Sequence, residues 1–80
     1  MPSEPQREAV GKIVRHSLSV AGHRTSISLE WAFWEEFKRI ANARRQPLAS
    51  LVASIDAGRG GANLSSAMRV FVLNAARRLQ

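Results

Sequence analysis

The chain has 80 residues, a hydrophobic fraction of 45% and a formal net charge of +6. This composition excludes a chain that is disordered throughout, and the length allows at most one domain. Because the chain has no cysteine, disulfides and thiolate metal sites are excluded as sources of stability, and we expect oligomerisation to complete a small core. The basic balance favours an anionic partner such as nucleic acid.

The beginning of the chain differs from the rest in composition. Residues 1–14 combine two prolines with mixed charges and show no periodicity, so we predict a mobile arm there and a single domain over 15–80. The arm lacks the apolar stretch of a signal peptide, and no later segment is apolar enough to span a membrane. We therefore expect a cytoplasmic protein without a membrane partner.

Apolar residues alternate with polar ones along residues 16–29, at even positions up to Val20 and at odd positions from Thr25 onward. Alternation of this kind, rich in β-branched residues, indicates strand. Gly22 lies where the phase changes, either at the bulge of one kinked strand or at the tight turn of a hairpin, and the sequence leaves both open. The expected fold class is mainly α with one short β-strand.

Three helices are predicted after the strand. Apolar residues recur at helical spacing over Glu30–Arg45 and again over Leu48–Ala57, and Pro47 separates the two helices. A glycine-rich break at 58–61 ends the second helix, and Asn63 or Ser65 caps a third amphipathic helix. No internal repeat is evident.

A single short strand has no partner in its own chain. Its unpaired backbone groups favour pairing with a second copy, which gives an intermolecular antiparallel β-ribbon in an intertwined homodimer. Side chains alternate between the faces of a strand, so one set points into the dimer core and the other outward. The inward set is Thr25, Ile27 and Leu29, and the outward set is Arg24, Ser26 and Ser28.

The outward set suits DNA. A two-stranded ribbon fits the major groove, where arginine binds guanine in bidentate fashion and serine hydroxyls donate or accept at several base edges. His23 at the ribbon end and Arg15 in the preceding segment are predicted to contact phosphates.

Two segments resemble a known family. The run Gly22–Glu30 reads G-H-R-T-S-I-S-L-E and precedes an aromatic-rich helix, and the run Asn63–Leu73 begins N-L-S-S-A. Together they resemble the ribbon-helix-helix domain, and most of all a bacterial subgroup of short proteins with these two segments. The resemblance covers roughly residues 15–77. It implies a homodimer whose ribbon reads the major groove, with Arg24, Ser26 and Ser28 as the base-reading residues.

The resemblance also implies a phosphate site. In that family, backbone amides at the start of the second helix hold a phosphate, which here are the amides of Leu48, Ala49 and Ser50. A third helix is additional to the usual pattern, so the helix start at 63–66 is left open as the alternative phosphate site.

The sequence therefore predicts a dimer that binds double-stranded DNA sequence-specifically, as a transcriptional repressor or regulator associated with the nucleoid. The alternative is a protein-interaction module, such as an antitoxin-like dimer that neutralises a partner protein. The motif content favours neither an enzyme nor a cofactor or metal site. The sequence leaves oligomers larger than the dimer open.

Overall fold

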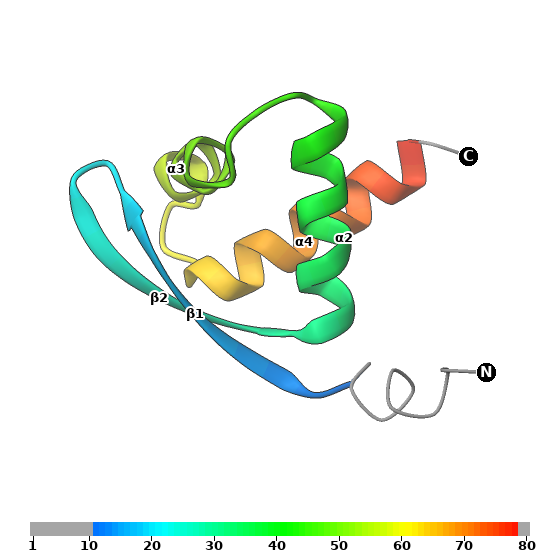
Figure 1. The fold of residues 1–80 in the computed structure, drawn as a ribbon, viewed down its shortest axis with the longest axis horizontal. Helices are drawn as coiled ribbons and strands as arrows, with labels where there is room; N and C mark the ends of the chain where they lie inside the picture. Colours follow the sequence, from blue (N-terminus) through cyan, green and yellow to red (C-terminus); the bar gives the residue numbers. More distant parts are fainter. Residues whose placement is uncertain (1–10, 79–80) are drawn as a thin grey trace.

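The computed structural model describes residues 11–78, in which a β-hairpin precedes three helices (Figure 1). The elements are β1 (Ile13–Val20), β2 (His23–Glu30), α2 (Trp31–Ala43), α3 (Leu48–Gly58) and α4 (Leu64–Arg78). This part of the chain is mainly helical, as expected. The predicted arm lies outside the described residues over 1–10, and its last two residues, Ile13 and Val14, belong to β1.

Of the two alternatives left open at Gly22, the hairpin is confirmed and the kinked strand is wrong, so the expected single short strand is corrected to two antiparallel strands. Ala21 and Gly22 make a two-residue turn between the paired residues Val20 and His23, with φ of 51° and 83°. Positive φ at both positions is the mark of a type I′ turn. Even-numbered residues of β1 therefore face odd-numbered residues of β2, which explains the change of phase. We expected β2 to pair with a strand of a second copy, but in this structure it pairs with β1 of the same chain.

The turn gives a first prediction. Ala21 lies in the left-handed region, which costs an L-residue other than glycine or asparagine about 1 kcal/mol. We expect Ala21→Asn, which creates the Asn-Gly pair preferred in type I′ turns, to raise the free energy of unfolding by roughly 0.5 kcal/mol. Urea denaturation measures the change. Ala21→Val is the matched control and should destabilise, and a destabilised Ala21→Asn would contradict this turn geometry.

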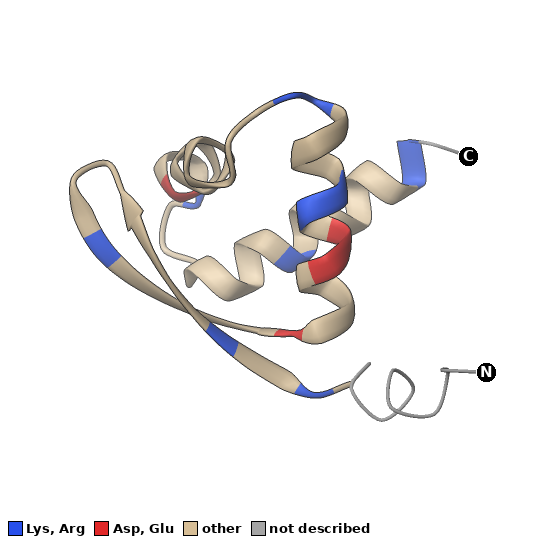
Figure 2. Ribbon diagram, in the orientation of Figure 1, with Lys and Arg blue, Asp and Glu red and all other residues tan. Residues whose placement is uncertain are grey.

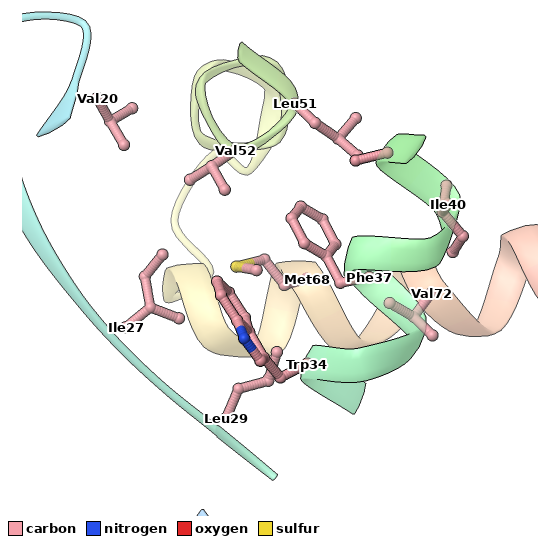
Figure 3. Packing of buried hydrophobic residues seen from close by; sticks show 11 residues of the cluster. Val20, Ile27, Leu29, Trp34, Phe37, Ile40, Leu51, Val52, Met68 and Val72 are labelled. Atoms are coloured by element: carbon pink, nitrogen blue, oxygen red, sulfur yellow. The ribbon is translucent and has the colours of Figure 1, made fainter. Parts of the chain in front are cut away.

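The helices cover one face of the hairpin and leave the other face open to solvent (Figure 1). Val20, Ile27 and Leu29 point from the hairpin into the core and are at most 2% exposed. Buried side chains from all three helices meet them there: Trp34, Phe37, Ile40 and Ala41 of α2, Leu51 and Val52 of α3, and Met68 and Val72 of α4 (Figure 3). The hairpin thus has one apolar face and one polar face.

The helix boundaries follow from local chemistry. After α2, Arg45 takes a φ of 55°, and the Gln46 amide donates to the Ala41 carbonyl at 2.9 Å, which ends the helix in a Schellman motif. At the start of α4, the Asn63 Oδ1 accepts from the Ser66 amide at 2.8 Å, so Asn63 is the cap. Over residues 11–78, no helix combines the length and the apolar character needed to cross a bilayer.

Candidate nucleic-acid interface

The open face of the hairpin carries alternate residues of both strands. Arg24, Ser26 and Ser28 of β2 are all exposed on it, as their alternation predicts. β1 contributes an equal number of exposed polar residues. We call the whole set the outward face: Arg15, Ser17, Ser19, Arg24, Ser26 and Ser28.

The outward face presents guanidinium and hydroxyl groups and no carboxylate. The Arg15 Nε donates to the Ser26 Oγ at 3.4 Å, so the Arg15 side chain lies across the face. Basic residues are spread along the hairpin, while its acidic residue, Glu30, lies where β2 meets α2 (Figure 2). A narrow ribbon with arginines and small hydroxyl residues can enter the major groove and bond to base edges.

Comparison with protein families matches residues 13–76 to a family described as a ribbon-helix-helix domain. The match runs from the first residue of β1 almost to the end of α4. The chain belongs to the ribbon-helix-helix family. Proteins of this family typically bind DNA, do so as dimers, and are not enzymes. Neither the curated proteins nor the solved structures gave a significant match.

In this ribbon-helix-helix chain, the predicted phosphate-binding residues Leu48, Ala49 and Ser50 form the first turn of α3. Pro47 precedes them and provides no side-chain cap, so the amides at this helix start have no side-chain acceptor. The Ser50 hydroxyl is exposed and accepts a hydrogen bond from the Gln46 Nε2 at 3.1 Å. An uncapped helix start is suited to an anion.

The start of α4, unlike that of α3, already has a side-chain cap at its first turn. Asn63 caps the Ser66 amide, and the Ser65 hydroxyl donates to the Ser28 carbonyl at 2.7 Å, which fastens α4 to β2. Of the two helix starts that the sequence left open, this difference favours α3 as the phosphate site. That assignment stays a prediction.

The two histidines occupy strand positions that alternate toward the helices, on the side opposite to the outward face. His23 is exposed beside the turn but faces away from Arg24, so its predicted phosphate contact would be made from the hairpin tip. His16 is half-buried and stacks on Trp34 with ring centroids 3.9 Å apart. Among the described residues, the His16 Nε2 is buried without a hydrogen-bond partner. His16 is therefore a packing residue.

Sequence reasoning missed the residues that β1 contributes to the outward face. Ser17 and Ser19 received no role, and Arg15 was assigned to phosphate alone. The available signal is the motif Arg-x-Ser-x-Ser, which begins at Arg15 and again at Arg24. Without the register of the hairpin, so short a repeat has no evident meaning.

An ion pair ties the end of the ribbon to α4. The Arg69 Nε donates to the Glu30 Oε1 at 2.8 Å, where β2 runs into α2. This hydrogen bond, followed by a backbone hydrogen bond, holds the pKa of Glu30 below its ordinary value, because both stabilise the ionised carboxylate.

The lowered pKa of Glu30 gives a second prediction. A carboxyl whose pKa falls on folding adds stability above its unfolded pKa, and this contribution is lost as the pH falls through the folded value. We expect an NMR titration to place the pKa of Glu30 below the ordinary glutamate value, and Arg69→Met to move it back up. Arg77→Met, at the far end of α4, is the control. An unchanged pKa of Glu30 in Arg69→Met would rule out the ion pair as the cause.

Proposed function

We propose that this ribbon-helix-helix chain binds double-stranded DNA sequence-specifically, with the outward face in the major groove, as a transcriptional repressor or regulator. The observation that supports the proposal most is the division of the hairpin into two faces. Helices cover the apolar face, whereas the exposed positions on the opposite side, between residues 15 and 28, are all arginine or serine. Nothing in the packing of the core requires these residue types, while base recognition uses them.

The proposed roles follow from the chemistry of each group. Arg24 donates two hydrogen bonds to the O6 and N7 of a guanine, and Ser26 and Ser28 bond to neighbouring base edges. The amides of residues 48–50 at the start of α3 hold a backbone phosphate, aided by Arg15 and His23. The formal net charge of +6 adds attraction for DNA that depends on salt concentration.

We propose that the chain acts as a homodimer, as its family does. Both strands of the described ribbon come from one chain, and we assign the contact between copies to the helices because α4 exposes apolar side chains. Val70 and Leu73 of α4 are 56% and 52% exposed, which is unusual for large apolar side chains. Val70 also lines a groove between α3 and α4, together with Ile55 and Phe71. Analytical ultracentrifugation should find a dimer that Leu73→Glu dissociates, and a monomeric native chain would refute this interface.

Fluorescence anisotropy with a random double-stranded DNA pool, repeated across a salt series and followed by sequencing of the bound fraction, tests the function. We expect affinity to fall steeply as salt rises and a short motif to be enriched. Salt-sensitive binding without enrichment would contradict sequence specificity. No binding at low salt would contradict DNA binding altogether.

A further inference from the structure

The two strands of the hairpin present the same residues in the same order on the outward face. β1 carries Arg15, Ser17 and Ser19, and β2 carries Arg24, Ser26 and Ser28. The register pairs them in reverse, because the strands are antiparallel. Arg15 lies opposite Ser28, Ser17 opposite Ser26, and Ser19 opposite Arg24.

This arrangement gives the outward face a local two-fold axis. The axis passes between Ser17 and Ser26, the central pair, at right angles to the ribbon. A half-turn about it exchanges the two strands and places each arginine where the other was. A single chain therefore displays the symmetry that two copies of one strand would otherwise supply.

The requirements of folding do not explain why the motif Arg-x-Ser-x-Ser occurs on both strands. The inner face of the hairpin does not repeat in this way, since the same half-turn exchanges His16 of β1 with Thr25 of β2, two residues of different chemistry. Exposed strand positions accept many polar residues, because they make few packing contacts. The repeat of one arginine and two serines is thus confined to the outward face, which is exposed and can contact a ligand.

Duplex DNA has matching symmetry wherever its sequence is an inverted repeat. Building on the proposed function, we propose that the hairpin of one chain reads both halves of a short inverted repeat. Arg15, Ser17 and Ser19 bond to the bases of one half as Arg24, Ser26 and Ser28 do in the other. Arg15 is thereby reassigned from the phosphate contacts to the base-reading residues.

The position and spacing of the arginines agree with this assignment. Arg15 bonds to Ser26 across the ribbon, so its side chain lies over the outward face and not along the edge that faces the flanking phosphates. Arg24 is opposite Ser19, four residues along β1 from Arg15, which is roughly 13 Å at the rise of a strand. At about 3.4 Å per base pair, that separation is about four base-pair steps. The expected site has a guanine on each DNA strand at this spacing.

Selection from the same random double-stranded DNA pool tests the proposal with full-length variants. The native chain should enrich an inverted repeat. Arg15→Ala and Arg24→Ala should each lose the preference for guanine in one half only, by roughly ten- to a hundredfold, and leave the other half intact. Arg15→Lys should retain only part of the guanine preference, because lysine can donate to O6 and N7 but lacks the planar fork of arginine. Circular dichroism checks that each variant is folded.

Lys12→Ala is the control, since Lys12 precedes β1 and should affect all sequences equally. An unchanged motif with Arg15→Ala, at lower affinity, would overturn the proposal and leave the proposed function standing, because Arg15 would then contact phosphate. Loss of both halves with Arg24→Ala alone would also overturn it, since two copies of β2 would then read the site. If the native chain enriches no motif, the proposed function fails and this proposal fails with it.

Discussion

Replacing Phe37 with alanine is expected to lower the free energy of unfolding by about 3–5 kcal/mol. Phe37 is completely buried at the centre of the core. Its ring stacks on that of Trp34 at 6.2 Å and meets that of Phe71 edge to face at 6.0 Å, so α2 and α4 are both held through it. Truncation removes the apolar contacts and leaves a cavity that a helix-bounded core can fill only in part.

Chemical denaturation followed by tryptophan fluorescence measures this loss. Phe33→Ala is the matched control on the same helix, where the side chain is only partly buried, and it should cost less than half as much. For so small a domain, a loss of this size leaves little stability. A loss of less than about 1 kcal/mol for Phe37→Ala would mean that the core is not organised around this ring.

Arg24→Ala is expected to weaken binding to the selected DNA site by roughly ten- to a hundredfold, or about 1–3 kcal/mol. The Arg24 side chain is exposed on the outward face, so its removal should leave the fold intact. Loss of a bidentate contact to guanine lowers the affinity for the cognate site far more than the affinity for unrelated DNA. Anisotropy on both duplexes, at one fixed salt concentration, measures the two effects separately.

Arg77→Ala removes the same charge from the far end of α4 and serves as the control. It should weaken binding to both duplexes slightly and equally, because a charge alone carries no sequence information. Arg24 is not a base-reading residue if its replacement does no more than that of Arg77.

The helices are the part of the fold that the sequence predicts best. Apolar spacing in Trp31–Ala43 and the break around Pro47 depend on local rules, and the structure confirms both within two residues. Asn63 caps α4 for an equally local reason, as one of the two residues considered.

The sequence alone could not distinguish a hairpin from one kinked strand, because the deciding contacts join residues that are distant in sequence. The alternation of β1 is masked at two places: His16 occupies a position on the apolar face, and Ile13 is 53% exposed on the other. His16 is accepted there because its ring stacks on Trp34, a contact between residues distant in sequence. Assigning Ile13 and Val14 to an arm hid the start of the strand.

The candidate site was predicted on β2 and missed on β1 for the same reason. Alternation alone brings Arg24, Ser26 and Ser28 to one face. That Ser17 and Ser19 share this face depends on the register, and the register depends on the length of the turn.

The length of the turn determines which residues of β1 lie on the same face as which residues of β2. Inserting one residue between Val20 and His23, without a compensating bulge, would put positions of the same parity opposite each other. With β2 held by its buried side chains, β1 would then have to bury its arginine and serines and expose its apolar residues. Insertions and deletions at the tip should therefore be tolerated in pairs of residues and rejected singly, so that loop length, as much as residue identity, preserves the face that is offered to DNA.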